Sequence, residues 1–270
     1  MRKIVYKNYL INVKSRPDRL ANATERFETL GLDFICVEAI TGEELIKSGA
    51  ELLTRPNMEA NWRSIQKVLT IFLASEDDFC FIYEDDVLFS PKFIEFYQNF
   101  QTLGFFDFDV LQFGYLLFDG NNDDGKKNKW KSRYSFVTQI IAKILSSLGT
   151  NKFFVLIKLS SFLIKIFNID VENNLRMVDL RKSLVLKESL VQGFEPGTHG
   201  FIIGRRMANL LVGYNLPMAM SGDLLFMTLG ATKKFKIYRL GVPLATQDET
   251  IPSVGIHASQ LFDLSNLFLK

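Results

Sequence analysis

Residues 79–86 read Phe-Cys-Phe-Ile-Tyr-Glu-Asp-Asp, an apolar run that ends in three consecutive carboxylates. A short apolar run between polar segments is typical of a buried β-strand. Outward from it, similar patterns predict strands and intervening helices: the strands are expected at 9–13, 34–40, 108–113 and 201–203, and the helices at 20–30, 61–75, 91–100 and 207–212. This alternation predicts an α/β fold with a mixed, mostly parallel sheet flanked by helices.

The composition indicates one folded domain. Of the 270 residues, 47% are hydrophobic and 23% are charged, which provides material for a core and excludes a predominantly disordered chain. The net charge of +2 is unevenly distributed, since residues 126–190 hold 13 Lys and Arg against 4 Asp and Glu. We therefore expect a single domain over residues 1–270 with a basic, helical insert over residues 120–190. An overall charge this close to neutral predicts no binding of nucleic acid.

Residues 135–169, within this insert, contain no Asp or Glu but four lysines among many Ile, Leu and Phe residues. Two interpretations remain open. The segment is either an amphipathic element that contacts an anionic membrane, or a helical pair packed on the domain with its lysines in solvent. No run of about 18 apolar residues occurs, so a membrane-spanning helix is not expected.

The cysteines and the N-terminal residues suggest a location. Cys36 and Cys80 lie in apolar runs and are predicted to be buried free thiols, as is typical of a reducing compartment. Lys7 and Lys14 interrupt any apolar run that could serve as a signal peptide. We expect a cytoplasmic protein, peripheral on the inner face of the membrane if residues 135–169 bind lipid.

The carboxylates that end the apolar run are candidate metal ligands. In an open α/β sheet, ligands bind beyond the carboxyl ends of the strands. Glu84 and Asp86 are two residues apart, so both side chains lie on the same side of an extended segment and can share one divalent cation. Carboxylate oxygens favour Mg²⁺ or Mn²⁺. The alternative is an acidic turn that binds nothing.

A basic loop follows the first predicted strand and is expected at the same edge of the sheet. Arg16 and Arg19 have the guanidinium geometry that suits phosphate oxygens, and Asp18 can accept hydrogen bonds from a base or a ribose. The alternative is a solvated loop with one local Arg–Asp pair. Together, an acid pair and a basic loop at one edge predict a site for a nucleoside diphosphate.

Five segments, in order, resemble motifs of glycosyltransferase family 25, the group of lipopolysaccharide and collagen galactosyltransferase-like enzymes. They are Tyr-Leu-Ile-Asn-Val (9–13) with Arg-Pro-Asp-Arg (16–19), Phe-Ile-Tyr-Glu-Asp-Asp-Val (81–87), Gly-Thr-His-Gly-Phe-Ile-Ile-Gly-Arg-Arg (197–206), Ser-Gly-Asp-Leu (221–224), and Pro-Leu-Ala-Thr-Gln (243–247) with Ser253. The second resembles the family's metal-binding acidic motif. The matches span residues 9–256, which covers most of the chain.

The resemblance implies a GT-A-like, Rossmann-like fold and an inverting, metal-dependent transfer of a hexose, with galactose favoured, from a UDP-sugar to a hydroxyl of a lipopolysaccharide, another surface glycan or a lipid-linked glycan. The residues expected to contact the nucleotide sugar are Asn12, Arg16, Asp18, Arg19, Asp85 and His199. His199 has the alternative role of a structural histidine. His257 is expected as a third metal ligand beside Glu84 and Asp86, with a surface histidine as the alternative.

Asp223 is the predicted general base, because partial desolvation raises the pKa of a carboxyl towards neutrality. It can also cap a helix, and Glu195 is the reserve base. The chain departs from the family where a Ser-His pair is common, since Ser64 is followed by Ile65. Two alternatives therefore stay open: a metal-dependent nucleotidyl- or phosphoryl-transfer enzyme, and a non-catalytic family member that binds glycans or membranes.

Overall fold

The computed structural model describes residues 4–100, 107–115, 190–195, 197–218, 221–231, 235–241 and 243–248. The strands are β1 (Tyr6–Asn12), β2 (Ile35–Glu38), β3 (Phe79–Glu84), β4 (Val87–Phe89), β5 (Val110–Gly114), β6 (Leu190–Gln192), β7 (Gly200–Gly204), β8 (Ile237–Leu240) and β9 (Ala245–Gln247). The helices are α1 (Pro17–Thr29), α2 (Gly42–Lys47), α3 (Pro56–Leu73), α4 (Phe93–Asn99), α8 (Arg205–Leu211) and α9 (Gly222–Ala231).

The nine strands form one sheet in the order β2-β1-β3-β7-β5-β8-β6, with β9 pairing both β4 and β5. Strand β1 is parallel to β2 and to β3, whereas β7 lies antiparallel between β3 and β5. Among the described strands, four pairings are parallel and four antiparallel, so the prediction that most are parallel is wrong. The reason is physical: a strand buried on both faces is continuously apolar in either direction, so its pattern carries no direction.

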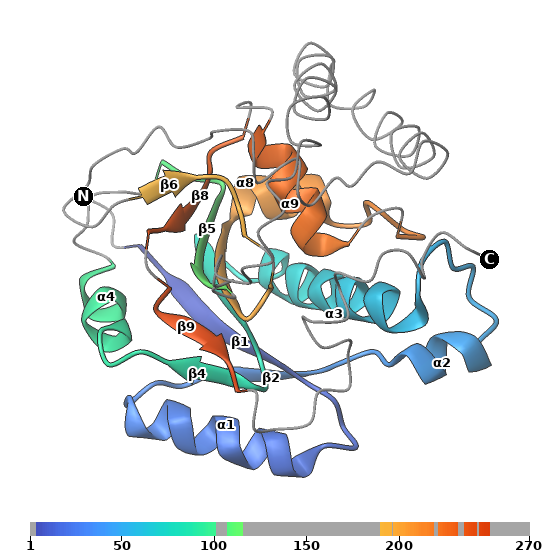
Figure 1. Ribbon diagram of the computed structural model, residues 1–270, viewed down its shortest axis with the longest axis horizontal. Coiled ribbons are helices and arrows are strands. Elements are labelled where there is room, and N and C mark those ends of the chain that lie inside the picture. The colour runs from blue at the N-terminus through green and yellow to red at the C-terminus, as the bar shows by residue number, and fades with distance from the viewer. Residues whose placement is uncertain are drawn as a thin grey trace, which may run out of the picture.

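Side chains alternate across the sheet and form two cores. On one face, Ile11 and Ile82 pack with helices α3, α8 and α9. On the other, Leu10 and Phe81 pack with α1 and α4 in a cluster rich in phenylalanine. Figure 1 shows the two groups of helices on opposite sides of the sheet. The sheet flanked by helices is therefore confirmed as an α/β fold.

Local sequence signals explain where the helices near the candidate site begin. Pro17 and Pro56 occupy the first position of α1 and α3, where the missing N–H has no helical partner to lose. Helix α2 begins with a capping box, in which Thr41 and Glu44 bond to each other's backbone N–H groups. Helix α1 thus begins within the basic loop, and its first turn directs Arg19 into the protein.

The predicted strands and helices in the described ranges are confirmed, with shifts of a few residues at their ends. Residues 120–189 of the predicted insert, including 135–169, lie outside the described residues. None of the helices in the described ranges is long and apolar enough to cross a lipid bilayer. Cys80 is buried as predicted, but Cys36 is exposed, because the edge strand β2 has a neighbour on one side only.

Candidate functional site

A cleft of about 280 Å³ opens beyond the carboxyl ends of β1 and β3. Its lining includes apolar side chains, such as Ile11, Ile40 and Met58, which come from β1, the segment after β2 and α3. Its charged and titratable residues are Arg19, Glu84, Asp85, Asp86, His199 and Asp223. The predicted strand edge is therefore the place where the candidate residues meet.

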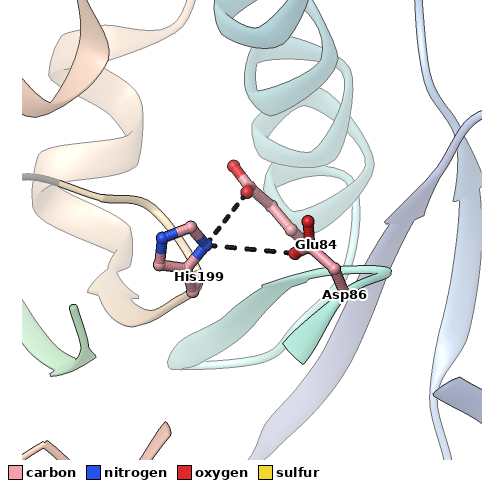
Figure 2. Close-up of side chains that lie close together, drawn as sticks. All are labelled: Glu84, Asp86 and His199. Atoms are coloured by element: carbon pink, nitrogen blue, oxygen red, sulfur yellow. Dashed lines mark ion pairs between the residues drawn. The ribbon is translucent and has the colours of Figure 1, made fainter. Parts of the chain in front are cut away.

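Glu84, Asp86 and His199 form a compact group in which one ligand atom from each lies within 4.8 Å of the others. The Nδ1 atom of His199 is 3.3 Å from Glu84 Oε2 and 3.9 Å from Asp86 Oδ1. Figure 2 shows the imidazole directed at both carboxylates. The antiparallel pairing explains this, because Gly200 on β7 lies opposite Tyr83 on β3, so the residue before Gly200 faces the residue after Tyr83.

The contact between Glu84 and His199 favours the charged form of both groups. Burial alone raises the pKa of Glu84, but the close contact with His199 and its charge, with a 2.5 Å bond from Thr198 Oγ1 and a 3.0 Å bond from Asn61 Nδ2, lower it overall. Burial alone lowers the pKa of His199, but Glu84 and the neighbouring Asp86 and Asp223 raise it overall. An ionised Glu84 is the form that ligates a cation, whereas His199 ligates one only after it has lost its proton.

Asp86 is buried, and its two oxygens have different surroundings. Oδ2 accepts hydrogen bonds from Arg19 and, at 3.2 Å, from Gln247 Nε2. Oδ1 is buried and accepts no hydrogen bond from the described residues, and both ring nitrogens of His199 likewise have no hydrogen-bond partner there. Burial and the negative charge of Glu84 raise the pKa of Asp86. An orphaned carboxylate oxygen directed at a second carboxylate and an imidazole fits a cation.

Arg19 and Asn12 hold the acidic segment through their side chains, and Arg19 also lines the cleft. The Arg19 guanidinium is buried and pairs with both Asp85, at 2.7 Å, and Asp86. Asn12 Nδ2 donates to Asp85 Oδ2 at 2.7 Å. Burial raises the pKa of Asp85 to about 6 although Arg19 opposes the rise. Both side chains are engaged with the carboxylates, and Arg19 also lines the cleft, so the prediction that Asn12 and Arg19 contact the nucleotide stays a prediction.

Arg16 and Asp18 form a local ion pair, as in the alternative interpretation of the basic loop as solvated. Arg16 forms hydrogen bonds to Asp18 through Nε and an ion pair of 2.7 Å through Nη2. The Asp18 side chain is 58% exposed, and neither residue lines the cleft. The pair is the local contact expected of a solvated loop, and the prediction that these two side chains bind the nucleotide stays a prediction.

Asp223 and Glu195 have different surroundings. Asp223 lies in the first turn of α9 and lines the cleft with Glu84 and His199. A Cβ on Gly222 would lie 2.9 Å from Trp62 Cε3, so this glycine allows α9 to approach α3 closely. Asp223 is in the helix rather than before it, so it is not the N-cap; a carboxylate there still suits the helix dipole.

Glu195 lies outside the described cleft lining and forms an ion pair of 3.2 Å with Arg239 Nε on β8. Its role as the reserve base stays a prediction, and Asp223 is the candidate base that lines the cleft. His257, the predicted third metal ligand, lies outside the described residues. In the described chain the imidazole beside Glu84 and Asp86 belongs to His199. The sequence reasoning placed His199 at the cleft but assigned it to the sugar or phosphate.

Three residues of the site were missed by the sequence reasoning: Asn61, Thr198 and Gln112. Asn61 and Thr198 donate hydrogen bonds to Glu84. Gln112 lies within the apolar strand β5 and holds the segment that leads to Thr198. A lone amide in an otherwise apolar strand could have indicated Gln112, because a buried polar side chain needs hydrogen-bond partners.

No protein-family model and no curated protein sequence matches the chain. The site is therefore interpreted from its own geometry.

Proposed function

We propose that the chain is an inverting, metal-dependent glycosyltransferase of the GT-A type, which transfers a hexose from a UDP-sugar to a hydroxyl of a glycan or lipid-linked glycan. The observation that supports it best is the group of Glu84, Asp86 and His199 around an orphaned carboxylate oxygen, in a cleft beyond the carboxyl ends of parallel strands. The resemblance to glycosyltransferase family 25 supplies the choice of UDP-galactose and of a surface-glycan acceptor.

The two carboxylates suit Mg²⁺ or Mn²⁺, and the imidazole moves the preference towards a transition-metal ion. Mg²⁺ prefers an octahedron of oxygen ligands and retains several waters, whereas an imidazole nitrogen is a common ligand of transition metals. Glu84 and Asp86 offer oxygens and His199 offers a ring nitrogen. A cation held by these three residues would neutralise negative charge on the leaving nucleoside diphosphate.

In the proposed reaction, the acceptor hydroxyl oxygen forms a bond to the anomeric carbon while the bond from that carbon to the diphosphate oxygen breaks. Asp223 accepts the proton of the acceptor hydroxyl. Attack on the face opposite the leaving group inverts the configuration. Arg19 pairs with Asp85 and Asp86, and Asn12 donates a hydrogen bond to Asp85. The two side chains thereby hold these carboxylates in place.

The charges around the cleft favour glycosyl transfer over phosphoryl or nucleotidyl transfer. A transferred phosphoryl group requires positive side chains on its equatorial oxygens. Among the described residues that line the cleft, Arg19 is the only lysine or arginine, and its guanidinium is paired with two aspartates. Ile65, which stands where the family has a histidine, is buried in the core, so the imidazole of the cleft is supplied by His199.

A thermal-shift screen of nucleotide sugars with and without Mn²⁺ tests the proposal. A donor present at 100 times its dissociation constant stabilises the fold by about 2.7 kcal/mol. The expected result is a shift with a UDP-hexose and Mn²⁺ that is absent with the sugar nucleotide alone. Product analysis with simple glycoside acceptors should then show UDP and an inverted glycoside. Pyrophosphate as the product would indicate nucleotidyl transfer, and binding without turnover would indicate the non-catalytic alternative.

A further inference from the structure

Gln112 forms an unusually complete set of hydrogen bonds in the centre of the sheet. Its side chain is fully buried on β5. Nε2 donates to the backbone oxygens of Glu195, at 2.9 Å, and Gly197, at 2.7 Å, and Oε1 accepts from Glu195 N at 2.7 Å. Three bonds to one short segment fix the path of that segment, because the buried amide of Gln112 would otherwise be left unsatisfied.

The segment held by Gln112 leads directly to the metal group. Gly197, whose φ of +105° suits glycine, is followed by Thr198 and His199. Thr198 Oγ1 lies 2.5 Å from Glu84 Oε1, and His199 Nδ1 lies 3.3 Å from Glu84 Oε2. A shift of the segment would therefore displace both contacts to Glu84 together.

A close approach between β5 and β7 fixes the other side of His199. The pairing shifts register between Gln112 and Gly114, an irregularity often found beside active sites. A Cβ on Gly200 would lie 2.4 Å from Phe113 Cε2, and one on Gly114 would lie 2.8 Å from Gly200 N. His199 is thus held between the hydrogen-bonded segment before it and the tightly packed start of β7 after it.

We infer that Gln112 is a positioning residue for the metal group: its amide holds Glu195 and Gly197 so that His199 lies close enough to Glu84 and Asp86 to share one cation with them. This inference rests on the proposed function, since it assumes that the three residues bind a cation. Gln112 itself does not line the cleft among the described residues, so its effect is transmitted through the backbone.

The test compares Gln112→Met with Gln66→Met. Gln66 is a matched control, because it is also buried and also joins two backbone groups, the oxygen of Leu211 at 3.0 Å and the N–H of Gly213 at 2.7 Å, away from the metal group. Both variants lose a buried amide and should lose comparable thermal stability. Mn²⁺ affinity, measured by calorimetry on the full chain, is the reading that separates them.

For Gln112→Met we expect Mn²⁺ affinity to fall by about 10–100-fold, the range for residues that support metal ligands. The absorption spectrum of the Co²⁺-loaded protein should also change, because a displaced imidazole alters the ligand field. Gln66→Met should retain the parent's affinity and spectrum. If Gln112→Met does not unfold cooperatively, Gln112→Glu replaces it, since this variant keeps the side-chain size and the acceptor for Glu195 N but loses the donor to two carbonyls.

The outcomes distinguish the inference from the proposed function. A parent that binds no Mn²⁺ overturns both. A parent that binds Mn²⁺, with Gln112→Met binding it equally well and giving the same Co²⁺ spectrum, overturns the positioning role alone. Equal losses of affinity in Gln112→Met and Gln66→Met also overturn it, because they would reflect general destabilisation.

Discussion

Arg19→Met tests how the acidic segment is stabilised. Methionine has a similar length but no charge, so the substitution leaves Asp85 and Asp86 buried without the guanidinium that pairs with both. Asp85 keeps its bonds from Asn12, at 2.7 Å, and from Val13 N, at 3.4 Å. Asp86 keeps a single bond of 3.2 Å from Gln247. The negative charge of the cluster is then poorly compensated.

The expected loss follows from these contacts. A hydrogen bond to a charged group contributes about 1.5–3 kcal/mol, and removing one partner of a buried ion pair costs about 3–5 kcal/mol. Because Asp85 retains other partners, we expect the free energy of unfolding to fall by about 3–5 kcal/mol in total. For a chain of this size, each kcal/mol lowers the melting temperature by about 2–4 °C.

Denaturant unfolding at neutral pH, with and without Mn²⁺, is the assay. In Arg19→Met, Mn²⁺ should raise the unfolding midpoint more than it does in the parent, because the cation replaces part of the missing positive charge. Arg16→Met is the control, since its partner Asp18 is largely exposed and its loss should leave the midpoint unchanged. An Arg19→Met variant as stable as the parent would refute the assignment of Arg19 as the counter-charge.

Two further predictions concern catalysis and location. Asp223→Asn should retain Mn²⁺ and UDP binding but lower turnover by about 10²–10⁴-fold, because the general base is lost; a variant with a third of parental turnover would exclude that role. Residues 135–169 should co-sediment with anionic but not neutral vesicles, as each lysine near an anionic surface contributes about 1 kcal/mol. The control replaces Lys152, Lys158 and Lys165 by glutamate. Vesicle binding that persists in this variant would contradict an electrostatic contact with the membrane.

The fold was largely predictable because its strands are short apolar runs with clear polar ends. The run that ends at Glu84 predicted both a central strand and the edge at which the cleft lies. The antiparallel direction of β7 was not predictable, since burial on both faces erases directional information.

Individual side chains were harder to predict than the edge at which they lie. Arg19 was expected to face a ligand; helix α1 begins at Pro17, and the guanidinium that lines the cleft is paired with Asp85 and Asp86. Glu195 forms an ion pair with Arg239, which is distant in sequence and reaches it only through the sheet. Gln112 was visible in the sequence as a single amide in an apolar strand. Its role could not be predicted, because it depends on the backbone oxygens of Glu195 and Gly197, to which the amide donates.

The central claim is that Glu84, Asp86 and His199 bind a divalent cation that donor binding requires. Calorimetric titration of UDP into the parent and into Asp86→Asn, each with saturating Mn²⁺ and with EDTA, tests it most directly. We expect the parent to bind UDP only with Mn²⁺ and Asp86→Asn, although folded, to bind UDP in neither condition. Equal UDP affinity of the two proteins in Mn²⁺, or undiminished binding by the parent in EDTA, would contradict it.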